Sequence, residues 1–168
     1  IRIKQIRTGS DNPGLLECEI SFLRLIEKLT EGTEIDINHT GTGVTFKPGI
    51  LKGGEVEHSC HISRSIGYYL APLIPIAPFS KFAFKLTLGG ITTALGKDPS
   101  ADIIRLAYIP LLKHYGIQVK ELVEIKLKKR GAFPLGGGEL FFQCPIIRQS
   151  VPFSLERVGK VLKVRGIA

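Results

Sequence analysis

One pattern of helix and strand signals occurs twice along this 168-residue chain, with a period of 84 to 86 residues. Pro13 and Pro99 are 86 positions apart, and Gly32 and Gly116 are 84 positions apart. Each proline follows a strand and a polar loop, and apolar residues then recur at the spacing of one helix face. Each glycine is expected to end its helix, and Ser100 is expected at the N-cap of the second one. The chain is therefore predicted to contain two copies of one folding unit.

Strand signals around the two helices complete the repeated unit. Each helix is followed by an alternating strand, a glycine-rich turn and a second strand, at 34–39 and 44–47 in the first copy and at 122–128 and 139–143 in the second. The second copy begins with a strand at 56–60, a helix at 62–76 that two prolines interrupt, and a strand at 82–88. A further alternating strand is predicted from Val161.

These signals predict an α+β fold made of repeated βαβαββ units. Two amphipathic helices cover one face of a mixed sheet in each unit, because that arrangement buries a core. Residues 1–49 are predicted to form a first repeat that lacks its N-terminal part, 50–150 the second repeat, and 151–168 the start of a third.

The loop between the last two strands of the second copy is unusually rich in glycine. It follows a basic strand end and comprises Arg130, Gly131, Pro134, Gly136, Gly137 and Gly138 among its residues. Glycine loses more backbone freedom on folding than any other residue, and a tight hairpin needs only one or two. We therefore predict that backbone here comes close to another group; a hairpin with a bulge is the alternative.

The spacing Arg-Gly-x-x-Pro-x-Gly-Gly-Gly-x-apolar resembles the signature of the RNA 3'-terminal phosphate cyclase family. Further segments similar to that family lie at 6–9, 12–15, 46–49, 53–54 and 98–102. Those most like its eukaryotic cyclase-like branch, the ribosome-assembly proteins, lie at 11–15, 53–58 and 66–70. The resemblance implies a repeated unit similar to the C-terminal fold of translation initiation factor three. It also implies a strand and a helix before Ile1, and more than half of the protein after Ala168.

Composition favours a folded domain, and the charge is compatible with polyanionic partners. Hydrophobic residues make up 43% and charged residues 23% of the chain, the usual mix for a globular protein. The net charge of +8 is compatible with a polyanionic partner such as RNA, but charge alone favours an ordinary basic surface. The candidate phosphate contacts are Arg7, Lys128, Lys129 and Arg130, and no aromatic residues are interleaved with them for base stacking.

Several classes of site and environment are disfavoured. Three cysteines without a Cys-x-x-Cys pair argue against a disulfide framework and a structural zinc site, and four histidines show no metal-binding spacing. The apolar stretch 68–79 contains three prolines and is too short to span a bilayer. We therefore predict no metal and no membrane association.

The resemblance also maps the nucleotide site of the cyclases onto this sequence. Arg7 matches an arginine that in the cyclases helps line the site for the nucleotide and the RNA end. Where the cyclases carry small residues, this chain has the bulkier His61, Ile62 and Arg64, and Tyr68 stands where they have a glutamine. We expect these side chains to fill the space that a nucleotide needs. No catalytic residue and no cofactor are therefore assigned to this chain.

The function that the resemblance implies is small-subunit ribosome assembly, with pre-rRNA processing in the nucleolus of the nucleus. The implied partners are a ribosome-assembly GTPase, pre-rRNA and small-subunit pre-ribosome proteins, with RNA binding left open. Two enzymatic alternatives stay open. One is an ATP-dependent RNA 3'-phosphate cyclase, which a histidine nucleophile downstream of this chain would reveal. The other is a pre-rRNA endonuclease whose site lies outside this chain.

Overall fold

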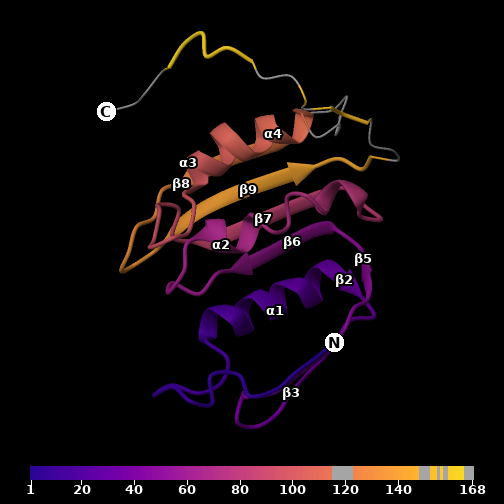
Figure 1. The fold of residues 1–168 in the computed structure, drawn as a ribbon, viewed down its shortest axis with the longest axis vertical. Helices are drawn as coiled ribbons and strands as arrows, with labels where there is room; N and C mark the ends of the chain where they lie inside the picture. The colour runs from indigo at the N-terminus through magenta and orange to yellow at the C-terminus, as the bar shows by residue number, and fades with distance from the viewer. Residues whose placement is uncertain (115–122, 148–151, 155, 157–158, 165–168) are drawn as a thin grey trace.

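The computed structural model describes residues 1–114, 123–147, 152–154, 156 and 159–164, which fold into a mixed α+β structure with three sheets (Figure 1). The α+β class predicted from the sequence is confirmed. Gly116, which was expected to end the second helix, lies outside the described residues. Among the described residues, no helix combines the length and the apolar character that crossing a membrane would require.

A four-stranded mixed sheet forms the centre of the structure. Its order is β6 (Gly54–Ser59), β7 (Phe84–Gly90), β9 (Gly138–Cys144) and β8 (Glu124–Lys129). The β6 and β7 strands are parallel, and the other two pairs are antiparallel. Side chains along β7 and β9 alternate between buried and partly or fully exposed, as the period of a strand requires when only one face is covered. The order from β6 to β9 is strand, helix, strand, helix, strand, strand.

Prolines shorten the first helix of this unit. Within the range 62–76, where one helix was predicted, the structure has the short helix α2 (Ile66–Leu70), and the 3-10 helix η1 (Ala77–Phe79) follows that range. Pro72 and Pro75 have no backbone N–H to donate, so a regular helix cannot continue through them. The predicted length of this helix was therefore wrong, although its place between β6 and β7 was right.

The second helix contains a wider turn that the sequence reading overlooked. It runs through α3 (Ala101–Ile103), the π-helical segment η2 (Ile104–Tyr108) and α4 (Ile109–His114). Pro110 cannot donate to the carbonyl four residues before it, and its ring would clash with that carbonyl. The Ile109 N–H bonds to the Ile104 carbonyl, five residues back, which widens the turn just before the proline.

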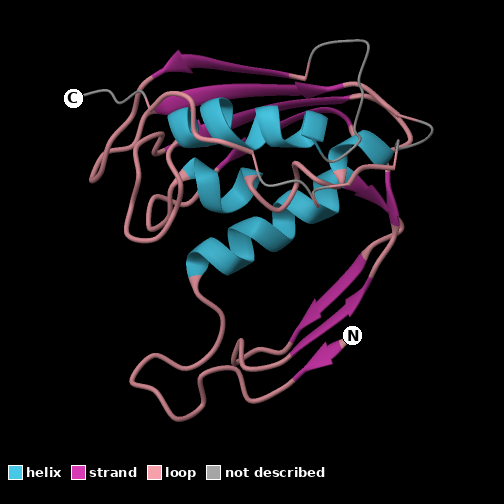
Figure 2. Cartoon of the chain, turned by 45° about the horizontal axis from the view of Figure 1, so that its top comes forward, coloured by secondary structure: helices cyan, strands magenta, loops and turns pink. Residues whose placement is uncertain are grey.

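The helices lie on one face of the four-stranded sheet, where the core forms (Figure 2). The helix α1 (Glu17–Leu29) joins this layer beside β6 and α2, and its Leu25 and Leu29 are fully buried. The Phe22 ring lies 6.2 Å from that of Tyr69, centroid to centroid. The core therefore extends across the boundary predicted between the first and second repeats.

The N-terminal strands form a separate three-stranded antiparallel sheet. Its order is β1 (Arg2–Ile3), β4 (Val44–Lys47) and β3 (Glu34–Ile37), while β2 (Thr30–Glu31) pairs with β5 (Ile50–Leu51). The prediction that Gly32 ends α1 was wrong, because the helix ends at Leu29 and Gly32, with φ of +78°, connects β2 to β3 instead.

The strand predicted from Val161 is not formed in the described residues 161–164. Val161, Leu162 and Val164 are exposed there. A strand gains stability only when a neighbouring strand accepts and donates its backbone hydrogen bonds, and no neighbour is described for this segment. The division into repeats 1–49, 50–150 and 151–168 stays a prediction.

Candidate functional site

The glycine-rich loop between β8 and β9 closes on its own backbone and on Thr92. The Gly131 N–H donates to Thr92 Oγ1 at 3.0 Å, and the Thr92 N–H donates to the Gly131 carbonyl at 2.8 Å. A Cβ at Gly131 would lie 2.1 Å from Gly138 N, and one at Gly138 would lie 2.6 Å from the Thr92 methyl. These two glycines are therefore required by contacts within the chain, where backbone passes backbone without room for a side chain.

The tip of the same loop is exposed and apolar. Gly136 and Gly137 have positive φ values of 66° and 74°, which favour glycine, and the Gly136 N–H donates to the Ala132 carbonyl at 2.8 Å. Between these contacts, Phe133 is 62% exposed and Leu135 89% exposed. The loop is thus a hairpin connection with a closed base and an exposed tip, and the β8–β9 ladder has a register irregularity just before it.

Most cations predicted to contact phosphate are paired with carboxylates of the chain itself. Arg130 donates to both oxygens of Asp102 in α3, at 2.8 and 3.2 Å, and this hydrogen bonding lowers the pKa of Asp102. Lys128 Nζ lies 2.7 Å from Glu139 Oε1. Lys129 is exposed and has no ion pair among the residues that the structure describes.

Arg7 fastens the loop after β1 to the start of α1. Its guanidinium donates to both carboxylate oxygens of Glu19 and, at 2.8 Å, to the Gly14 carbonyl. Glu19 also accepts from the Leu16 N–H at 2.9 Å, at the first turn of the helix. The hydrogen bonds from Arg7 are the main reason that the pKa of Glu19 is lowered. Arg7 therefore already has a structural role in this chain.

Arg64, in the loop between β6 and α2, is held by a buried carboxylate. Its Nε lies 2.7 Å from Asp98 Oδ2, and its NH2 also contacts Oδ1. The Ser65 N–H donates to Asp98 as well, at 3.0 Å. Burial alone would raise the pKa of Asp98, but the hydrogen bonds from Arg64 and Ser65 outweigh burial and lower it. Asp98 thus stays ionised with only 5% of its surface exposed.

Of the four side chains expected to fill a nucleotide space, Arg64 and Tyr68 pack against each other, whereas His61 and Ile62 do not take part in that contact. The Arg64 guanidinium carbon lies 4.1 Å from the centre of the Tyr68 ring, and the Tyr68 ring lies 5.8 Å from that of Phe22 in α1, so these residues occupy the region between the loop and the helix. Ile62 is 44% exposed and does not fill a buried space, contrary to expectation. His61 Nδ1 lies 2.9 Å from the Ser63 hydroxyl.

One polar pair was not found from the sequence. Ser21 Oγ in α1 lies 2.9 Å from His58 Nε2 in β6, and the pKa of His58 is lowered by burial and then by the nearby charges of Lys28 and Arg24. Their 37-residue separation leaves no local signal. Within the described residues no carboxylate bonds to His58, so the pair lacks the third group of a catalytic triad. Nor do the described residues contain a cluster suited to a metal ion.

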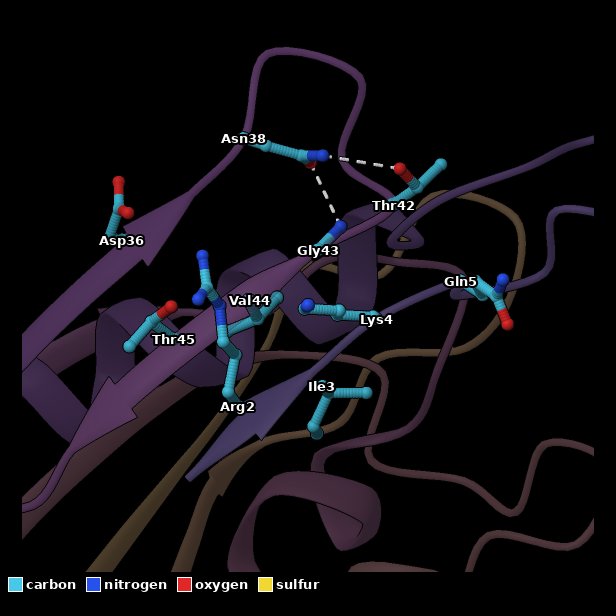
Figure 3. Close-up of a pocket in the computed structure, with 10 residues that line it drawn as sticks. All are labelled: Arg2, Ile3, Lys4, Gln5, Asp36, Asn38, Thr42, Gly43, Val44 and Thr45. Carbon is cyan, nitrogen blue, oxygen red and sulfur yellow. Dashed lines mark hydrogen bonds between the residues drawn. The ribbon is translucent and has the colours of Figure 1, made fainter.

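A cleft of about 270 Å³ lies on the N-terminal three-stranded sheet (Figure 3). Arg2 and Lys4 extend over the sheet with their charged ends in the cleft, and Asp36 stands on the far side. Asn38 at the rim accepts from the Gly43 N–H at 2.9 Å and donates to Thr42 Oγ1 at 3.3 Å. None of these residues had been singled out from the sequence as a contact for a ligand.

A comparison with known protein families assigns most of the chain to one of them. The family model for RNA 3'-terminal phosphate cyclase matches residues 1–159. The chain belongs to the RNA 3'-terminal phosphate cyclase family. The resemblance drawn from the loop and the segments before it is therefore confirmed.

Relatives in the RNA 3'-terminal phosphate cyclase family include proteins named cyclase-like and proteins named for rRNA processing. The chain is 45% identical to the RNA 3'-terminal phosphate cyclase-like protein of Homo sapiens, over 100% of this chain and 44% of that protein. It is 40% identical to the rRNA processing protein rcl1 of Schizosaccharomyces pombe, over 100% of this chain and 46% of that protein. The chain thus spans less than half the length of these relatives.

Proposed function

We propose that this chain is part of a protein that acts in pre-rRNA processing during small-subunit ribosome assembly and has no cyclase activity. The support for rRNA processing is the likeness to two relatives named rRNA processing proteins, which cover 100% and 83% of the chain. The proposal places the protein in the nucleolus, with a ribosome-assembly GTPase, pre-rRNA and small-subunit pre-ribosome proteins as its partners.

The observation that carries the absence of cyclase activity is the binding of Arg64 by Asp98. Arg64 is held through several hydrogen bonds and stacks on Tyr68, in a loop where the cyclases are expected to have small residues. A nucleotide bound there would have to displace a cation from a nearly buried carboxylate, and leaving that carboxylate unpaired is costly. The loop is therefore better suited to a structural role than to binding a nucleotide.

The proposed role is that of an interaction scaffold built from repeated βαβαββ units. The repeat division at 1–49, 50–150 and 151–168 belongs to this proposal, with the open sheet faces and the basic residues available to partners. RNA contacts through Arg7, Lys128 or Arg130 would have to compete with Glu19, Glu139 or Asp102. The pairs of Lys128 and Arg130 are exposed and contribute little to stability, so competition is feasible there, whereas the Arg7–Glu19 pair is part-buried. Lys129 has no competing carboxylate among the described residues.

A chimera tests the proposed function. The segment of the Schizosaccharomyces pombe rRNA processing relative that aligns with this chain would be replaced by the chain itself, in cells that carry no other copy. We expect normal pre-rRNA intermediates on RNA blots, because the whole chain aligns with that relative. Accumulation of unprocessed pre-rRNA in cells where the chimera is present at the level of the natural protein would contradict the proposal.

A further inference from the structure

The N-terminal three-stranded sheet has one apolar and one polar face. Arg2 pairs with Thr45 across β1 and β4, and Thr45 pairs with Asp36 across β4 and β3. Side chains alternate along a strand, so these three residues share a face, and the residues between them, such as Ile3 and Val44, share the other. Lys4, two residues after Arg2, extends over the polar face as well, and this face carries the cleft (Figure 3).

The two cations in this cleft have no carboxylate partner. Arg7, Arg64, Arg130 and Lys128 all form ion pairs, but neither Arg2 nor Lys4 does so with any described residue. Asp36 is the only carboxylate that lines the cleft, and it lies two strands away from Arg2, a separation of about 9.6 Å at the usual strand spacing. Both cations are exposed, so their charges are available to an external anion.

The backbone beside the cleft is held in an unusual conformation. Gln5 and Arg7 have positive φ values of 57° and 52°, and they are the only residues other than glycine with positive φ among those described. The intervening Ile6 N–H donates to the Thr42 carbonyl at 2.9 Å, which fixes this bend against the strand connection opposite. The bend follows β1, which ends at Ile3, and leaves Gln5 at the end of the cleft (Figure 3). Strained backbone of this kind is concentrated at functional sites.

We propose that this cleft binds the phosphodiester backbone of single-stranded RNA. Arg2 and Lys4 contact successive phosphates, with the Arg2 guanidinium able to donate two parallel hydrogen bonds to one of them. The Thr45 hydroxyl and the Gln5 amide supply neutral hydrogen bonds to phosphate or ribose. The Asp36 carboxylate repels a strand that crosses β3, so the RNA follows β1 and β4. This inference rests on the proposed role in pre-rRNA processing and identifies where RNA is held.

The chemistry of the cleft predicts binding without base selection. No aromatic side chain lines it, so bases have no surface to stack on there. The Asn38 amide is already bonded to Gly43 and Thr42 and forms a fixed rim. Phosphate contacts position a nucleic acid but carry no sequence information.

The test measures binding of the intact protein to a short single-stranded RNA by fluorescence anisotropy at several salt concentrations. The test variant carries Arg2→Gln and Lys4→Gln. The matched control carries Lys85→Gln and Lys97→Gln, which removes the same charge from two exposed cations that also lack a described ion pair. Losing two phosphate contacts should reduce the slope of log affinity against log salt by about 1.4, which corresponds to a loss of about 25-fold at ~0.1 M salt. The control should change affinity by less than about twofold.

Two outcomes would overturn the RNA site. One is an unchanged slope in the Arg2→Gln, Lys4→Gln protein, and the other is an equal loss in the control, which would indicate a general charge effect. A unimodal thermal transition at the temperature of the unsubstituted protein confirms that each variant is folded. The Schizosaccharomyces pombe chimera separates this inference from the proposed function. If the chimera processes pre-rRNA normally but the Arg2→Gln, Lys4→Gln protein has an unchanged salt slope for RNA binding, the RNA site in the cleft is rejected and the proposed function stands. Failure of the unsubstituted chimera rejects the function.

Discussion

Thr92 and Gly131 are joined by three hydrogen bonds although 39 residues separate them in the chain. The Thr92 hydroxyl accepts from the Gly131 N–H and donates to the Gly131 carbonyl, and the Thr92 N–H donates to the same carbonyl. Both residues are buried. A single threonine after β7 therefore closes the base of the glycine-rich loop and ties the β8–β9 hairpin to the start of α3.

Replacing Thr92 with valine should destabilise the protein by about 1–3 kcal/mol, because the buried Gly131 N–H loses its acceptor while the side-chain volume is nearly unchanged. Urea unfolding of the intact protein measures the loss, and hydrogen exchange at the Gly131 amide locates it. Thr87→Val, on the uncovered face of β7, is the control and should change stability by no more than about 0.5 kcal/mol. Equal effects of the two substitutions would contradict the role assigned to Thr92.

A methyl group at Gly131 should destabilise the protein because no space exists for it. Its Cβ would lie 2.1 Å from Gly138 N, so the loop backbone would have to move, at a cost of about 1–3 kcal/mol or more. Gly9→Ala is the matched control, since no atom lies within 4 Å of a Cβ there and its φ is not positive. The unfolding midpoints in urea of Gly131→Ala and Gly9→Ala give the comparison. A Gly131→Ala protein as stable as the control would show that the loop is not closed as described.

The bond between Arg64 and Asp98 should make stability depend on pH in the acid range. The folded-state pKa of Asp98 is lowered, so this carboxyl stabilises the fold above its unfolded pKa of about 3.9, and that contribution is lost as pH falls through the folded pKa. Asp98→Asn should lower stability near neutral pH. The difference in unfolding free energy between the natural protein and the variant should become smaller below about pH 4. Urea unfolding at several pH values measures this difference, and a difference that grows toward acid pH would contradict the prediction.

The intact protein should form no covalent adenylate with ATP. Arg64, in the loop after β6, and Tyr68, in α2, occupy the region that would have to accept the nucleotide, and displacing them would cost about 1–3 kcal/mol, or roughly one to two decades of affinity. Incubation with α-labelled ATP, followed by denaturing electrophoresis, gives the readout. A true cyclase treated in parallel supplies the positive control. An acid-labile labelled band from this protein would restore the cyclase alternative.

Local sequence patterns predicted several strands closely, although the strand expected from Val161 is not formed in the described residues. The strand predicted at 44–47 is β4, and that at 139–143 lies within β9 (Gly138–Cys144). Alternation and flanking glycines are read from neighbouring residues, so they need no knowledge of the fold. The helices were predicted less well. Pro110 was overlooked, and the effect of Pro72 and Pro75 was underestimated, because a proline's cost depends on whether the surrounding packing can absorb a distorted turn.

The sequence by itself determined the family, the α+β class and the order of helices and strands from β6 to β9, because these depend on motif spacing and on side-chain periodicity along the chain. Only the tertiary structure decided which charged side chains are paired within the chain and which are available to an external ligand. Arg64 and Asp98 are 34 positions apart, and Arg130 and Asp102 are 28 apart, so each pair forms only when the sheet and helix layers assemble. Arg2 and Lys4 are cations like those arginines, but neither forms an ion pair with a described residue. Coulomb attraction depends on distance in space, which the order of residues does not specify.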